Sequence, residues 1–293
     1  EAIGFMKQLT TVVGKYFPNA LIIAEESTAW GGVSNPVHAG GLGFDYKWNM
    51  GWMNDFLEYM KKDSIYRKYH HNELTFSMLY AYTEKFILVL SHDEVVHGKG
   101  SLLSKMPGDN WQKFANFKLM LAFMYSHPGK KLLFMGTEFA PWNEWNEMQG
   151  VQWKLSQWSP HKNAEIFLSQ LNHLYLQEPA LWEKDNEPSG FEWIDSNNAK
   201  QSIVSFIRHG KKKKDDLIIV CNFTPETYFE FRLGVNEKGK YKEIFDTDHK
   251  DINGSGVIQN GIHKTENINW NGKNQSIIFG LPPLGAVIFK KIN

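Results

Sequence analysis

The sequence predicts an α/β domain followed by an all-β domain. Up to about residue 184, short apolar runs alternate with helical patterns, and polar residues follow the ends of those runs. This is the order of βα units that carry their chemistry at the carboxyl ends of parallel strands. From there on, short runs recur at regular spacing between Gly, Asn, Asp and Lys, a pattern typical of a β-sandwich. We therefore expect domains at residues 1–184 and 185–293.

The elements of the first domain follow from apolar periodicity. Residues 1–16 place Ile3, Phe5 and Leu9 on one helical face, which predicts an amphipathic helix. The run at residues 21–24 is short and wholly apolar, so we expect a strand buried on both faces, as in a parallel sheet. Apolar runs also predict strands at 86–90 and 131–136, and residues 44–48 are a possible further strand. Helices are predicted at 50–61, 111–125 and 161–177.

The second domain is predicted from runs of strand length. Turn-forming residues separate these runs, as expected for antiparallel strands joined by short loops. The predicted strands lie at 191–194, 202–207, 217–221, 227–233, 241–245, 258–263, 275–279 and 286–290.

Charge and cysteine usage exclude several classes of protein. The chain of 293 residues has 32 Lys and Arg against 32 Asp and Glu, which removes the electrostatic case for binding nucleic acid or an anionic membrane. Its one cysteine, Cys221, excludes a disulfide framework and fits a reducing compartment. Because no signal-peptide pattern is visible either, we expect a cytoplasmic location.

Two acidic residues stand at the ends of predicted parallel strands. Glu25 follows the first strand and Asp93 follows the third, so both can face one cleft. Paired carboxylates serve glycoside chemistry, in which one protonates the leaving oxygen and another attacks or stabilises the oxocarbenium centre. The alternative is that both only cap the following helices. His92, next to Asp93, joins the cleft if the chain bends there; otherwise it satisfies backbone groups.

Metal and cofactor sites are not predicted. His92 and His97 in HDEVVH are five residues apart, whereas the zinc-protease helix motif needs two His four apart. The glycines at 98 and 100 lack the upstream Gly of a phosphate-binding loop.

The aromatic content of 14% points toward a sugar ligand, because aromatic faces pack against the apolar faces of pyranose rings. Most tryptophans are expected in the core. We expect one or two near the strand ends to contact the ligand, Trp48 among them. The candidates are Trp30, Trp48, Trp52, Trp142, Trp145 and Trp153.

Three stretches resemble the bacterial 1,4-α-glucan (glycogen) branching enzymes of the α-amylase superfamily. They are AEEST at 24–28, LSHDEVVHGK at 90–99 and KLLFMG at 131–136. The resemblance implies an enzyme that cuts an α-1,4 linkage, holds the cut piece covalently and transfers it to a 6-hydroxyl of glycogen or amylose. It further implies that Glu25 is the general acid/base, that Asp93 stabilises the transition state and that His92 hydrogen-bonds the sugar. No nucleic-acid or membrane partner is implied.

One departure from the family is decisive for the expected activity. The family's nucleophile lies in an Arg-x-Asp-Ala motif, which does not occur in these 293 residues. The chain thus resembles the second half of a (β/α)8 barrel plus the C-terminal β domain, and we expect an apolar open edge, association with the N-terminal half of the barrel and no activity alone. The alternatives are a glucan hydrolase of the same superfamily and a non-catalytic glucan-binding fragment.

Overall fold

The computed structural model describes residues 1–292. The first part of the chain alternates helices with four short strands, as predicted. Its elements are α1 (Ala2–Tyr16), β1 (Ile23–Ala24), β2 (Tyr46–Trp48), α2 (Met50–Lys61), α3 (Ser64–Arg67), α4 (Asn72–Thr75), β3 (Phe86–Leu90), α5 (Leu102–Lys105), α6 (Asn110–Ser126), β4 (Lys130–Leu133) and α7 (Ser159–Gln177).

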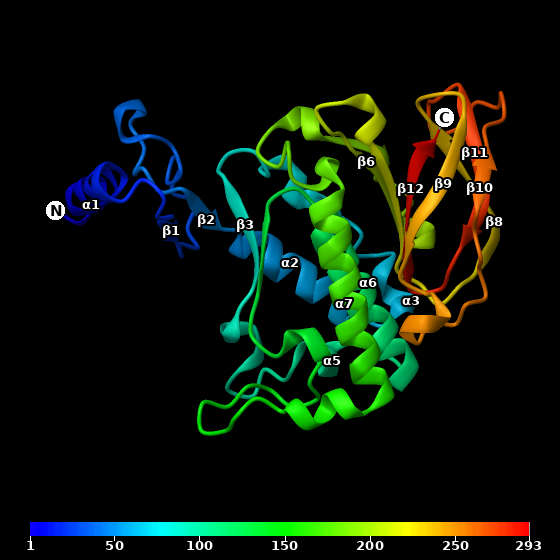
Figure 1. Cartoon of the computed structure of the whole chain (residues 1–293), viewed down its shortest axis with the longest axis horizontal. Helices are drawn as coiled ribbons and strands as arrows, with labels where there is room; N and C mark the ends of the chain where they lie inside the picture. The colour runs from blue at the N-terminus through cyan, green and yellow to red at the C-terminus, as the bar shows by residue number, and fades with distance from the viewer. Residues whose placement is uncertain (293) are drawn as a thin grey trace.

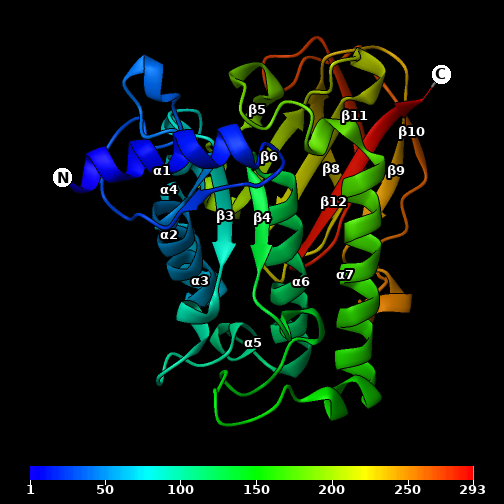
Figure 2. The same ribbon diagram turned by 60° about the vertical axis from the view of Figure 1, so that its left-hand side comes forward.

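The four strands form one parallel sheet in the order β1-β2-β3-β4. Ala24 pairs with Lys47, Trp48 with Ile87, and Ile87 with Lys130. Figure 2 shows β3 and β4 side by side and pointing the same way. Because all pairings are parallel, the carboxyl ends of the four strands lie at one edge of the sheet. This is the strand arrangement of half a (β/α)8 barrel.

The second part of the chain is an antiparallel β-sandwich. A six-stranded sheet has the order β10-β9-β12-β7-β6-β5, and β11 pairs with β8 in a second sheet. Ile207 and Val220 of the larger sheet share one buried core with Leu233 and Ile277 of the smaller one. The predicted all-β class is therefore confirmed. The strands are β5 (Phe191–Asp195), β6 (Ile203–Arg208), β7 (Leu217–Asn222), β8 (Tyr228–Val235), β9 (Lys240–Asp246), β10 (Ile262–Lys264), β11 (Gln275–Leu281) and β12 (Gly285–Ile292).

Helix α6 joins the two parts through a common core (Figure 1). Phe123 on α6 lies 6.2 Å from Phe206 and 5.8 Å from Phe223, ring centroid to ring centroid, and both partners belong to the β domain. The buried guanidinium of Arg67 donates to the carbonyl of Phe223 at 2.8 Å. The face of the larger sheet that is turned away from the smaller sheet is therefore covered by the α/β part.

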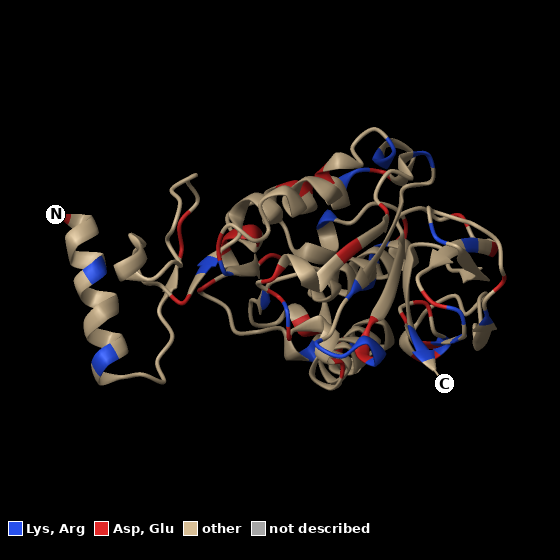
Figure 3. Ribbon diagram, turned by 90° about the horizontal axis from the view of Figure 1, so that it is seen from above, with Lys and Arg blue, Asp and Glu red and all other residues tan. Residues whose placement is uncertain are grey.

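The predictions for the first strand and the first helix need correction. The strand is only Ile23–Ala24, and Leu21 and Ile23 are 65% and 41% exposed instead of buried. In α1 the apolar residues Phe5 and Leu9 are also exposed, and the helix lies at one end of the molecule (Figures 1 and 3). The apolar pattern of these segments is that of a core, but the described residues cover only one side of it.

One predicted strand of the β domain differs from the structure. The strand predicted at 258–263 is also wrong in extent, because pairing begins only at Ile262.

Basic and acidic segments are interspersed over the whole molecule (Figure 3). None of the helices within residues 1–292 combines the length and the apolar character that a bilayer crossing requires.

Candidate active site

The candidate site lies at the carboxyl edge of the parallel sheet. Glu25 follows β1 directly, Trp48 is the last residue of β2, and Asp93 lies in a 3-10 turn, His92–Val95, that follows β3. Consecutive, mutually paired parallel strands thus bring residues 68 positions apart in the sequence to one edge. Edges of this kind carry the active sites of barrel enzymes.

Glu25 and Glu26 have different surroundings. The side chain of Glu26 lies 2.6 Å from the ammonium of Lys47, which is itself buried and also donates to the Thr28 carbonyl at 3.1 Å. Partial burial by itself raises the pKa of Glu26, but the hydrogen bonds from Lys47 and Thr28 outweigh it and lower that pKa below its usual value. Both residues line a hollow that Trp30 also lines, but Glu25 is exposed whereas Glu26 is half-buried. The Glu26 carboxylate is therefore held in an ion pair, whereas the Glu25 side chain is exposed to solvent.

His92 and Asp93 point to the same side because the chain turns at once after β3. Ser91 begins the turn: its hydroxyl accepts from the Asp93 N–H at 3.2 Å, and the Glu94 carboxylate accepts from the Ser91 N–H. This reciprocal cap fixes the bend. His92 Nε2 then lies 3.2 Å from Asp93 Oδ1, and both side chains are nearly half exposed. In a continued strand the two would face opposite ways.

Two aromatic side chains, Phe134 and Trp145, lie beside His92. The His92 ring centroid lies 5.9 Å from that of Phe134, just after β4, and 6.1 Å from that of Trp145. Trp145 also donates its backbone N–H to the Val95 carbonyl at 2.8 Å. These contacts place the imidazole beside the ends of β3 and β4.

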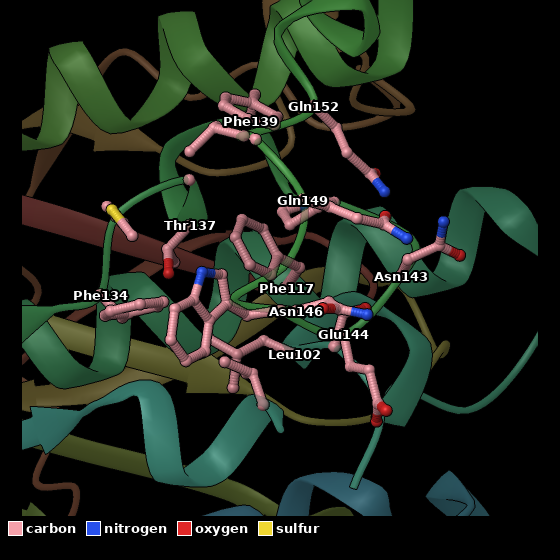
Figure 4. Close-up of a pocket in the computed structure, with 18 residues that line it drawn as sticks. Leu102, Phe117, Phe134, Thr137, Phe139, Asn143, Glu144, Asn146, Gln149 and Gln152 are labelled. Atoms are coloured by element: carbon pink, nitrogen blue, oxygen red, sulfur yellow. The ribbon is translucent and has the colours of Figure 1, made fainter. Parts of the chain in front are cut away.

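A narrow cavity lies next to these aromatic side chains, beneath the loop at residues 136–152. Figure 4 shows Phe117 and Phe134 toward one side of it and the amides of Asn143 and Gln149 toward the other. Its volume is about 60 Å³, whereas small-molecule sites occupy about 300–1,000 Å³. The cavity therefore does not take a sugar ring, and the exposed strand edge is the candidate site.

Two charged residues that the sequence did not single out hold the loop after Asp93. The Glu144 carboxylate accepts hydrogen bonds from the backbone N–H groups of Gly98 at 3.0 Å and Gly100 at 2.9 Å. The Lys105 ammonium donates to three carbonyls of the same loop, including that of Glu94 at 2.7 Å. Burial lowers the pKa of Lys105 to about 8.

The backbone N–H groups of this glycine loop therefore bind an anion, and that anion is the Glu144 carboxylate of the same chain. Gly98 and Gly100 both have positive φ, at 79° and 72°, a conformation that glycine adopts without strain. The signal in the sequence was this pair of glycines, while the partner Glu144 lies more than forty residues away.

The expectation that most tryptophans lie in the core is wrong, because Trp52 alone is buried and the others are half-buried or exposed. Trp52 is buried in the core, and Trp48 is half-buried and packs against it. Trp30, beside Glu25, is 51% exposed. Trp30 and Trp48 are thus the tryptophans nearest to the ends of β1 and β2.

Comparison with known proteins gives consistent relatives. Residues 193–292 match the family model described as the C-terminal all-beta domain of alpha amylase. A protein of Halothermothrix orenii named 1,4-alpha-glucan branching enzyme is 54% identical over all 293 residues, and one of Clostridium perfringens with the same name is 50% identical over 292. The chain spans 46% and 44% of the lengths of these relatives.

Solved structures of lower identity share the fold. An α-amylase from Geobacillus thermoleovorans, complexed with acarbose, superimposes with a TM-score of 0.67 at 12% identity, covering 99% of this chain and 57% of that one. The α-amylase from H. orenii gives a TM-score of 0.62, also at 12% identity, over 99% and 57% of the two chains. At this identity the likeness concerns the fold alone.

Proposed function

We propose that the chain supplies part of the active site of a 1,4-α-glucan branching enzyme, because it is 54% identical over its whole length to a protein of that name and spans 46% of that protein. The resemblance expected from residues 24–28 and 90–99 is thereby confirmed. The proposed reaction cuts an α-1,4 linkage of a glucan such as glycogen or amylose and transfers the cut segment to a 6-hydroxyl. The observation that carries the proposal is the common edge that Glu25, Trp48 and Asp93 share at the ends of β1, β2 and the turn after β3.

Each residue has a proposed role. Glu25 acts as general acid toward the leaving glycosidic oxygen and then as general base toward the acceptor hydroxyl, as retaining chemistry requires of one residue. Its exposure at the hollow that Trp30 also lines supports this role, since Glu26 is already paired with Lys47. Asp93 is the carboxylate that stabilises the oxocarbenium-like transition state and orients sugar hydroxyls.

His92 and Trp48 are proposed to bind the substrate. The imidazole of His92, held between Asp93, Phe134 and Trp145, presents a hydrogen-bonding edge to a sugar hydroxyl. Trp48 offers an aromatic face near the end of β2. Together these groups combine the flat apolar surface and the polar atoms that a pyranose ring requires.

The covalent step needs a group from outside these residues. The Arg-x-Asp-Ala motif of the family nucleophile is absent from the chain, and we propose that the N-terminal half of the barrel supplies it. Exposed apolar side chains on α1 and β1, among them Phe5 and Ile23, support a contact with that half. We further propose the division into domains at 1–184 and 185–293 and a cytoplasmic location for the protein.

The reaction type is tested by linkage analysis. A full-length protein that contains this chain is incubated with amylose, and new α-1,6 linkages are measured against new reducing ends. A branching enzyme forms one α-1,6 linkage for almost every α-1,4 linkage that it cuts, so α-1,6 linkages increase while the number of reducing ends stays constant. A steady gain of reducing ends without branches would instead identify a hydrolase.

A further inference from the structure

The β domain lies at the end of the molecule away from α1 (Figure 1). That domain carries a second hollow. It lies between the segment that follows β5 and strand β8, and its volume is about 340 Å³, within the range of about 300–1,000 Å³ that small-ligand sites occupy. We call it the Trp270 groove. Its lining includes Asp195, Asn198, Gln201, Tyr228, Glu230 and Trp270.

A tight turn presents Trp270 to this groove. The N–H of Trp270 donates to the Lys273 carbonyl at 3.0 Å, and the N–H of Lys273 donates back at 2.8 Å. Asn271 and Gly272 between them have φ of 48° and 70°, which is the two-residue turn that an Asn-Gly pair favours. The indole remains 47% exposed. An exposed aromatic side chain on so short a turn is held without the support of a core.

The turn itself is tied to the rest of the domain. Asn271 Oδ1 accepts from the N–H of Gly234 at 3.0 Å, and Asn271 Nδ2 donates to Asp195 Oδ2 at 3.3 Å. These bonds connect the turn to β8 and to the end of β5, the two segments that border the groove. The backbone that carries Trp270 is therefore tied to both walls before any ligand binds, which lowers the entropy cost of binding.

The rest of the lining combines a second aromatic ring with uncharged and charged polar groups. Tyr228 lies 6.0 Å from Phe231, edge to face, and Phe231 lies 5.7 Å from Phe279 in the core. Asn198 and Gln201, whose side chains bond to each other at 2.7 Å, add amide donors and acceptors. Aromatic faces with hydrogen-bonding groups of both kinds suit a neutral ring that has an apolar face and a rim of hydroxyls.

We propose that the Trp270 groove binds an α-1,4-glucan chain at a site separate from the strand-end site. The identity of the ligand rests on the proposed function, since that function supplies the class of polymer. Binding a long glucan here keeps its other segments near the enzyme and raises their effective concentration at the strand ends. The groove would then increase the rate of reaction for long polymers more than for short oligosaccharides.

The test is affinity electrophoresis of the 293-residue chain in gels that contain amylose. Trp270→Ala is expected to raise the apparent dissociation constant about tenfold, equivalent to ~1.4 kcal/mol, and Trp270→Phe to recover much of the affinity. The matched control is Phe229→Ala, which removes a neighbouring aromatic side chain that is 71% exposed but outside the lining. Thermal unfolding of each variant verifies that it is folded.

A His92→Ala variant separates the two sites. The proposal expects Trp270→Ala to weaken amylose retardation as strongly in this background as in the wild type, because the Trp270 groove is separate from the strand-end site. Failure of the wild-type chain to bind amylose overturns the proposal, and so does equal retardation of wild type and Trp270→Ala. If the full-length protein shows no glucan transfer and Trp270→Ala still loses amylose binding, the groove stands and the proposed function falls.

Discussion

The ammonium of Lys47 lies 2.6 Å from the carboxylate of Glu26, at the junction of β1 and β2. This ion pair separates two adjacent acidic residues that the sequence alone leaves equivalent. The Glu26 carboxylate is held by Lys47, whereas the Glu25 side chain is exposed at the carboxyl edge of the sheet. The assignment of Glu25 as the acid/base depends on this separation.

The Lys47–Glu26 pair predicts a specific dependence of stability on pH. Hydrogen bonds from Lys47 and Thr28, outweighing burial, lower the folded-state pKa of Glu26 from 4.5. A lowered carboxyl pKa stabilises the fold above the unfolded value, and that stabilisation is lost as the pH falls through the folded value. Thermal unfolding of wild type and Glu26→Gln should therefore differ at pH 7, by up to about 1 kcal/mol, and the difference should shrink as the pH falls below 4.5. A difference that stays constant over this range would refute the role of the charge.

The Glu144 clamp predicts local protection of the loop after Asp93. Replacing Glu144 by Gln leaves one acceptor oxygen where two N–H groups, of Gly98 and Gly100, now bond. Hydrogen–deuterium exchange should accelerate at those two amides and remain unchanged in α6. The control is Glu147→Gln, an exposed residue of the same loop. Equal exchange in the two variants would mean that Glu144 does not hold the loop.

Arg208 predicts that the two domains unfold together. Its fully buried guanidinium bonds to Asp185 at 2.7 Å and to the Ser126 carbonyl on α6 at 2.7 Å. Removing one partner of a buried ion pair costs about 3–5 kcal/mol, so Arg208→Met should lower the urea midpoint in a single transition.

The contrast is Lys61→Met, which breaks an exposed pair with Glu58 and should cost less than about 1 kcal/mol. Two separate unfolding transitions in the wild-type chain would contradict a shared core.

The 293-residue chain by itself is predicted to be inactive. It contains the proposed acid/base but not the motif of the family nucleophile, and without a nucleophile no glycosyl-enzyme forms. Incubation with amylose should leave the iodine colour unchanged, while a full-length protein that contains the chain shifts it. Any sustained colour shift by the chain alone would disprove the requirement for the missing half.

Elements whose signals are local could be predicted from the sequence. The helix expected at 50–61 is found at Met50–Lys61, where the Asn49 side chain caps the first turn by accepting from the Trp52 N–H. The wholly apolar run at Phe86–Leu90 is a buried strand as expected. In both elements the apolar residues that predict the element are also the ones that are buried against other described residues.

Features that depend on distant partners could not be predicted. The apolar run at 21–24 was expected to be buried, but Leu21 is exposed because only one side of β1 is covered. The bond from Gly100 to Glu144 joins residues 44 positions apart, and no periodicity in the sequence indicates it. The common orientation of His92 and Asp93 depends on the Ser91 cap, which the sequence offered only as one of two outcomes.

The central claim is that Glu25 acts as the acid/base at the shared strand edge, and one substitution tests it most directly. In a full-length protein that contains this chain, Glu25→Gln keeps the size and polarity of the side chain but cannot transfer a proton. The account predicts that the rate of glucan transfer falls by at least about 100-fold while the affinity for maltoheptaose stays within about twofold of wild type. Retained transfer, or a loss of affinity as large as the loss of rate, would contradict it.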